Sequence, residues 1–208
     1  MRNMQRATAM ALVFTFGLAI PATGWAADFS DPEWPCLQRR VENMSLGLMW
    51  THPIPDGKIP AEIRPQAHEL AETLVLRRVS LIEAEALIEG FLRDTPGVTD
   101  AVLGQIFRVV FERINSNRSQ LIGGITRYSL AQIVAAERID KTRGEMDQLM
   151  AAEAPDYDRV DAIEEQLDWQ QRIYRDRAQA LTYVCETPVL LEKRTFALAQ
   201  ALAKHLQS

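Results

Sequence analysis

Residues 160–184 read VDAIEEQLDWQQRIYRDRAQALTYV and carry the clearest pattern in the chain. Apolar residues recur there at alternating steps of about three and four, between many charged residues. That spacing predicts an amphipathic helix with one narrow apolar seam, as in coiled coils. The seam residues are Val160, Ile163, Leu167, Tyr174, Leu181 and Val184.

The segment before this helix is predicted to pair with it. Helical spacing of apolar residues runs from Ile125 to Met150, and Ala154-Pro155-Asp156 then makes a short turn. Helices joined by so short a turn pack as antiparallel neighbours. We therefore expect a coiled-coil-like hairpin over about 125–187, bounded by a break or kink at Gly123-Gly124 and by an end or kink at Thr187-Pro188.

The rest of the chain predicts a helical body. Ser80 and Glu83 have the spacing of a capping box, and Thr99 stands where a further N-cap is needed. Residues 60–122 and a separate C-terminal helix over 189–206 have broad apolar faces. The fold class expected is all-α, a helical body with a long antiparallel hairpin.

The N-terminus has the layout of a cleaved signal peptide over residues 1–26. Arg2 and Arg6 precede an apolar run from Ala9 to Ile20, which is too short for a membrane span, and Gly24-Trp25-Ala26 fits a cleavage site. Residues 27–59 are expected to be irregular, with one short helix over Leu37–Trp50. Residues 60–208 would form a single all-helical domain.

Two cysteines, Cys36 and Cys185, are the only ones in the chain. An isolated pair in an exported protein is expected to form a disulfide. The composition, rich in arginine relative to lysine, suggests a bacterial source and therefore the periplasm or secretion as the destination.

Charge excludes two classes of partner. Removing residues 1–26 takes away two arginines and no acid, which changes the net charge from −5 to −7. An acidic chain without a basic block has no electrostatic footprint for nucleic acid or anionic lipid. After signal cleavage, no further segment is expected to span a membrane.

The chain offers little for catalysis or cofactor binding. No serine-nucleophile, dinucleotide, phosphate-loop or haem-attachment motif is present. His68 and Glu72 are weak metal candidates on one helix face, with Glu69 a conceivable base, and the ordinary interpretation is a solvated face. A second weak set of soft ligands is Cys36, Met44, Met49 and His52. No cofactor and no enzymatic activity are expected.

Trp169 lies outside the seam of the 160–184 helix, with Ile173 one turn further on and Arg172 beside them. Tryptophan and arginine are favoured at protein contact surfaces. One interpretation is an exposed contact surface, and the other is that Trp169 packs under the first arm or the body.

These observations favour an exported, non-catalytic interaction or scaffold protein whose hairpin contacts a protein partner or a second copy. The alternative is a binding protein for a small apolar ligand or metal inside the body, suggested by the broad stripe around Phe91, Phe107 and Phe111.

Export predicts a shortened protein. Expressed in a Gram-negative host, the chain is expected in the periplasmic fraction with an intact mass that corresponds to a start at Ala27, because the signal is removed there. Ala26→Arg should block cleavage, so that this variant keeps the full mass of its own precursor. Recovery of the unprocessed wild-type chain from the cytoplasm would contradict this expectation.

Overall fold

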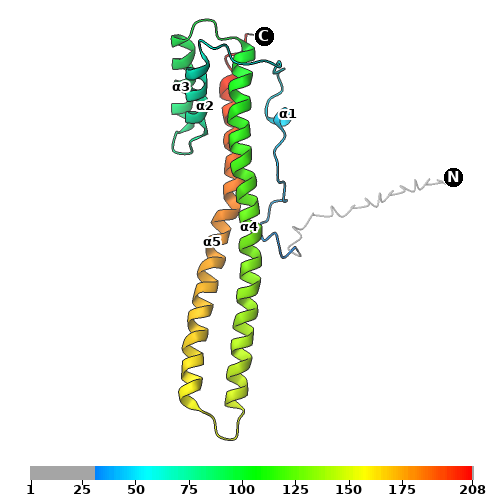
Figure 1. The fold of residues 1–208 in the computed structure, drawn as a ribbon, viewed down its shortest axis with the longest axis vertical. Coiled ribbons are helices and arrows are strands. Elements are labelled where there is room, and N and C mark those ends of the chain that lie inside the picture. The colour runs from blue at the N-terminus through cyan, green and yellow to red at the C-terminus, as the bar shows by residue number, and fades with distance from the viewer. Residues whose placement is uncertain (1–30, 208) are drawn as a thin grey trace, which may run out of the picture.

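A computed structural model of the protein describes residues 31–207, and over these residues it is entirely helical apart from loops and turns. The signal peptide expected over residues 1–26 lies outside the described residues. Five helices follow in order: α1 (Leu46–Met49), α2 (Arg64–Val75), α3 (Leu81–Asp94), α4 (Asp100–Met150) and α5 (Tyr157–Ala203). The expected all-α class with a long antiparallel hairpin is confirmed (Figure 1).

The hairpin of α4 and α5 is longer than the sequence predicted. Its arms have 51 and 47 residues, so it runs the full length of the molecule. The break expected at Gly123-Gly124 does not occur, because Ile122 and Ile125 on either side are buried and hold the helix together. Each glycine costs about 1 kcal/mol in a helix interior, which such burial offsets.

The end of the second arm at Pro188 is also absent. Pro188 is a buried residue inside α5, and the expected separate C-terminal helix is the last part of that same helix. An interior proline costs about 3 kcal/mol. Buried Cys185 and Leu191 flank it, and their packing maintains the helix through this position.

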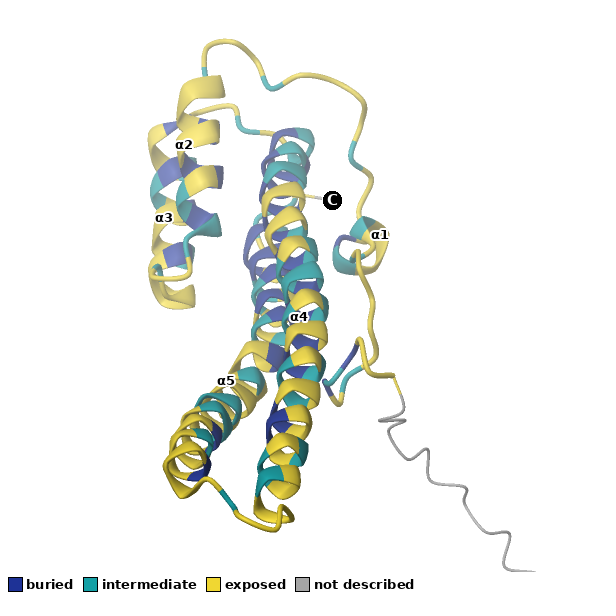
Figure 2. Ribbon diagram, turned by 60° about the horizontal axis from the view of Figure 1, so that its bottom comes forward, coloured by how far each residue is buried: buried dark blue, intermediate teal, exposed yellow. Residues whose placement is uncertain are grey.

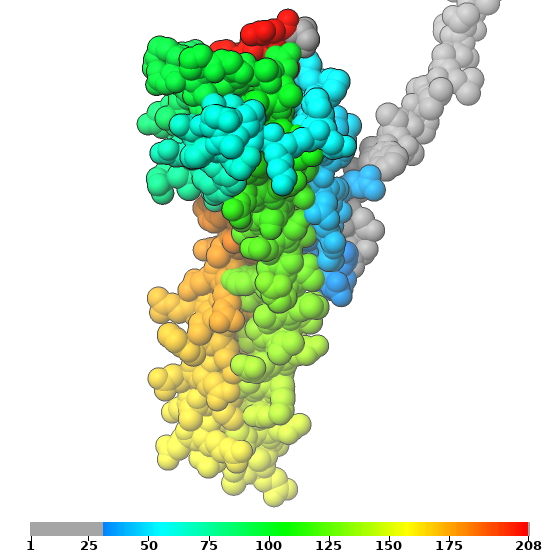
Figure 3. Space-filling model, turned by 45° about the horizontal axis from the view of Figure 1, so that its top comes forward, coloured from blue at the N-terminus to red at the C-terminus, as the bar shows by residue number. Residues whose placement is uncertain are grey.

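The body is built on the upper half of the hairpin. There α2 and α3 form a second, shorter pair that packs on α4 and α5 and closes an apolar core (Figures 1 and 2). The fully buried side chains of this core include Leu74, Ile88, Phe107 and Leu198. The lower half of the hairpin extends beyond α2 and α3 (Figure 3).

Ser80 and Thr99 occupy the N-cap positions expected for them. The Ser80 side chain accepts from the Glu83 N–H, and the Glu83 carboxylate accepts from the Ser80 N–H, which lowers the pKa of Glu83. Asp156 caps α5 by accepting from the Arg159 N–H. Thr99 occupies the N-cap position of α4 without a side-chain cap hydrogen bond.

The segment before α2 differs from the expected helix over Leu37–Trp50. Only Leu46–Met49 is helical. We call residues 31–50 the strap: apart from this one turn of helix, they form a non-helical segment that lies along the hairpin (Figure 1). Val41 and Leu48, which lie in the expected helix, are both exposed.

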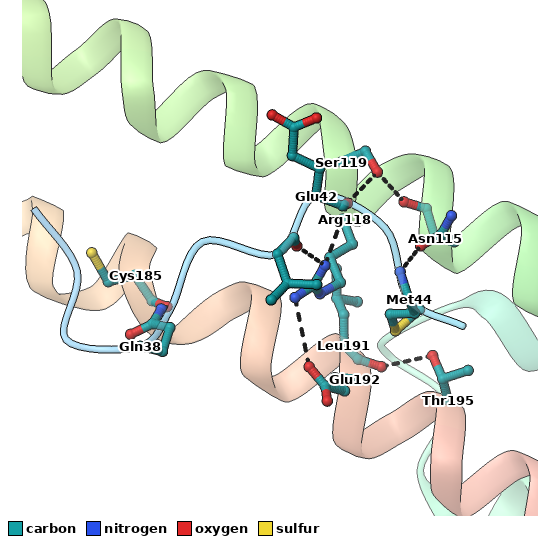
Figure 4. A network of polar contacts seen from close by, with 11 residues as sticks. Gln38, Glu42, Met44, Asn115, Arg118, Ser119, Cys185, Leu191, Glu192 and Thr195 are labelled. Carbon is teal, nitrogen blue, oxygen red and sulfur yellow. Dashed lines mark hydrogen bonds and ion pairs between the residues drawn. The ribbon is translucent and has the colours of Figure 1, made fainter. Parts of the chain in front are cut away.

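Polar side chains of α4 explain why the strap is not helical. Arg118 donates to the Val41 carbonyl at 2.6 Å and Ser119 to the Glu42 carbonyl at 2.7 Å, while Asn115 accepts from the Met44 N–H at 2.8 Å (Figure 4). Main-chain groups that would bond within a helix are satisfied by α4 instead.

A disulfide fixes the start of the strap. The Cys36 and Cys185 sulfurs are 1.97 Å apart, which confirms the expected bond, and Trp34, Ile122 and Ile125 are buried around it. Gln38 also donates to the Cys185 carbonyl. The bond joins residues 149 apart in sequence, so it constrains the unfolded chain strongly.

Arg194 of α5 fixes the α2–α3 pair. Its guanidinium donates to the carbonyls of Leu74, Leu76 and Val79 at 2.7, 2.9 and 2.8 Å, at the C-terminal end of α2 and the turn that follows. Partial burial, together with the nearby charge of Arg77, lowers the pKa of Arg194.

Removal of the disulfide should destabilise the fold. In the chain-entropy model, a loop of this length is worth about 4–5 kcal/mol. The Cys36→Ser, Cys185→Ser double variant is therefore expected to unfold at lower urea concentration than the oxidised protein. Reductant should shift the wild type in the same direction and leave the double variant unchanged; equal midpoints for all samples would refute this role.

Loss of Arg194 should loosen the α2–α3 pair. Arg194→Ala leaves three carbonyls without their charged donor and is expected to lower the free energy of unfolding by about 2 kcal/mol in urea titrations. Arg113→Ala provides the control, because Arg113 makes an exposed pair with Glu72 and such pairs contribute little. An equal loss for the two variants would contradict the anchoring role.

Candidate interaction surface

Trp169 lies on the lower half of α5 and is 63% exposed. Arg172 is exposed beside it and Ile173 is half-buried. Trp169 is therefore not packed under the first arm or the body, and that interpretation is wrong. The lower half of α5 is largely exposed on its outer side (Figure 2), and most of the residues exposed there are charged.

The face of α5 that packs on α4 does not include Trp169 or Arg172. Val160 and Leu167 are buried there, and the half-buried Tyr174 lies on the same side. Two α4 side chains donate to main-chain carbonyls of α5: Gln132 to Tyr174 and Tyr128 to Arg177, each at 3.2 Å. The two arms are thus held together by one face of α5.

A second stripe runs along α5 at heptad spacing. We call it the outer stripe. Its members alternate at steps of three and four along the whole helix. They are Arg159, Ala162, Gln166, Trp169, Ile173, Asp176, Ala180, Tyr183, Thr187, Leu190, Arg194, Ala197, Ala201 and Lys204.

The upper part of the outer stripe is the surface on which α2 and α3 rest. Arg194 bonds the α2–α3 turn, Ala201 is buried, and Lys204 pairs with Glu85 of α3 at 2.6 Å. Leu190 borders a hollow of about 270 Å³ together with Leu81 at the start of α3. The stripe is therefore a real packing surface over this length.

Within residues 31–207, no helix covers the lower part of the same stripe. Trp169 and Tyr183 are 63% and 76% exposed, and Ala162, Gln166 and Ala180 are exposed as well. A helix that presents two seams is suited to a bundle of three or more helices, and below Leu190 the described chain supplies only two. The geometry leaves one seam unfilled.

A hollow of about 330 Å³ lies between the strap and the hairpin. Its lining is largely apolar, and Arg118 stands at its wall with its side chain 6% exposed. The guanidinium also lies 3.6 Å from a Glu192 carboxylate oxygen, so the charge is partly neutralised within the wall (Figure 4). Further lining residues are Trp34, Met44, Met49, Pro188 and Val189.

Sequence reasoning missed Arg118, although a signal was present. The buried stripe of α4 has Phe111, Ile114, Ile122 and Ile125 at helical spacing, and Arg118 falls in line with them. An arginine in an apolar stripe has to meet acceptors on folding. Here those acceptors are the strap carbonyls.

The expected ligand space around Phe91, Phe107 and Phe111 is filled by the protein itself. Trp50 of the strap is buried and stacks on Phe107 with a ring separation of 5.0 Å. The broad apolar stripe of α4 is thus covered by Trp50 and by the α2–α3 pair.

The weak metal candidates do not come together. His68 and Glu72 are exposed on α2, and Glu72 is paired with Arg113 at 3.0 Å. Cys36 is engaged in the disulfide and cannot serve as a thiolate ligand. Among residues 31–207, no group of three or more His, Cys, Asp or Glu side chains is arranged to hold a metal ion.

No helix within the described part of the chain is long and apolar enough to cross a membrane. No known protein family, curated protein or solved structure matches the chain. The arrangement of its own residues, with an uncovered packing stripe as its main exposed feature, is what remains to indicate a function.

Proposed function

We propose that this protein is an exported, non-catalytic helical interaction protein of the bacterial periplasm, which binds a protein partner through the lower half of its hairpin. The observation that supports the proposal is the outer stripe of α5. Where α2 and α3 cover it, the stripe is a packing surface; below Leu190 the same spacing continues with Trp169 and Tyr183 exposed.

An exposed tryptophan of this kind costs solvation free energy unless it is covered in the functional state. Trp169 is flanked by charged residues that keep the free protein dispersed and can form the polar rim of an interface. The hairpin also extends away from the body, which leaves its outer face open to a partner (Figure 3).

The proposed compartment is supported by the disulfide. A bond between Cys36 and Cys185 needs an oxidising environment, and it holds the strap that links the N-terminal end of the mature chain to α5. Secretion to the outside of the cell is the other destination compatible with a disulfide bond.

A second candidate function is binding of a small apolar ligand under the strap. The hollow of about 330 Å³ beside Arg118 favours it, since apolar walls with one charged group suit an amphiphilic molecule. The Arg118 guanidinium already donates to the strap carbonyls and lies close to Glu192, so it is less available to a ligand. Ligand binding is therefore the weaker proposal.

The interaction proposal is tested by crosslinking in living cells. A photo-reactive residue at position 169 is expected to give a discrete protein adduct, identified by mass spectrometry, because this position lies in the uncovered stripe. Position 134 is the matched control: Val134 is 53% exposed on α4, two residues from Gln132, which faces α5.

An adduct at 169 and none at 134 would support the proposal. Equal labelling at the two positions, or none at either, would contradict it. In the latter case a rise in melting temperature with long-chain fatty acids, lost in Met44→Trp, would favour the ligand-binding alternative.

A further inference from the structure

We propose that the partner of the outer stripe is a second copy of this chain, bound antiparallel so that two hairpins form a four-helix bundle. This inference rests on the proposed function, since it names the partner of that same surface. Three features support the second copy: the continuity of the stripe with an internal helix-packing surface, the order of its charges, and the fit of its apolar residues.

Continuity determines what kind of partner fits. The upper outer stripe accepts the antiparallel helix pair α2–α3, with Arg194, Ala201 and Lys204 in the contact. The lower stripe repeats the same three-and-four spacing, so it is shaped for another helix pair. The lower hairpin of a second copy is such a pair, and it presents the same stripe in return, as a two-fold dimer requires.

The charges favour the antiparallel orientation. Arg159 and Asp176 lie within the stripe, and Glu165 and Arg172 lie on one of its flanks. None of these four residues forms an ion pair within residues 31–207. A parallel dimer would set the two residues within the stripe, Arg159 and Asp176, each beside its own copy, with like charges in contact, which is unfavourable.

One antiparallel register pairs every one of these charges. If Gln166 lies opposite Trp169 of the second copy, helical spacing places Arg159 opposite Asp176 and Glu165 opposite Arg172, each twice by symmetry. A shift by one heptad, with Trp169 opposite Ile173, brings Arg172 beside Arg172 of the second copy. Polar pairs inside a helix seam fix register in this way.

The apolar residues fit the same register. Small Ala162 faces Ile173 of the second copy, and Gln166 faces Trp169, whose indole N–H can donate to the Gln166 side-chain oxygen. Tyr157, the first residue of α5, lies level with Ala178 of the second copy, and neither belongs to the stripe. The α5 helix of the second copy therefore begins about 18 Å below Leu190, at 1.5 Å per residue, and Tyr183 lies outside this helix contact.

The test is sedimentation equilibrium of the purified full chain together with three variants. The wild type is expected to dimerise reversibly. Trp169→Ala and Arg172→Glu should each raise the dimer dissociation constant by about tenfold or more, because the first removes the central aromatic and the second creates two pairs of like charges. Glu165→Arg combined with Arg172→Glu should restore dimerisation, because the swap recreates opposite charges.

Arg175→Glu is the matched control. It makes the same charge change on the same helix, and Arg175, bonded to the Gln171 carbonyl, lies away from the stripe. It should sediment as the wild type does. Circular dichroism and thermal melts establish that each variant is folded, so that a loss of dimer is not a loss of structure.

A monomeric wild type, or a double variant that fails to regain what Arg172→Glu loses, would overturn the second-copy proposal. The crosslinking experiment distinguishes the interaction function from self-association. An adduct at 169 that contains a different protein keeps the interaction function and removes self-association, whereas an adduct that maps to residues 162–170 of the same chain supports the register.

Discussion

The seam between α4 and α5 is the interaction on which the other contacts of the molecule depend. Both helices are far longer than a typical helix of a globular domain, and helices in proteins draw most of their stability from packing an apolar face rather than from helix propensity. Each gains its stability from the apolar face it buries against the other. This pairing also explains why two glycines and a proline stay within continuous helices, since their local cost is smaller than the burial lost by breaking the seam.

Two arginines attach the rest of the chain to this seam by the same device. Arg118 of α4 donates to carbonyls of the strap, and Arg194 of α5 donates to carbonyls at the end of α2. In each case a charged side chain from a regular helix satisfies main-chain acceptors of an irregular segment that has no helix or sheet partner. The disulfide adds a covalent constraint at the far end of the strap.

Coverage of the hairpin is unequal as a result. Among residues 31–207, α2, α3 and the strap pack around the upper half, whereas the lower half extends beyond α2 and α3 (Figure 3). The outer stripe of α5 passes without interruption from the covered half to the uncovered half. An interaction function, and a second copy as the partner, are proposals that follow from this asymmetry and from the order of charges near Trp169.

By itself, the sequence determined the helical class, the turn at Pro155, the cap at Ser80 and the disulfide partners, because each depends on local spacing or on a choice without competitors. It also identified Trp169 as lying off the seam, although not whether it is exposed. Only the tertiary structure decided that Gly123-Gly124 and Pro188 stay within continuous helices, that the strap is extended, and which carbonyls Arg118 bonds. Those outcomes depend on packing between residues far apart in the chain, which outweighs local helix propensity by a few kcal/mol and leaves no mark in a short stretch of sequence.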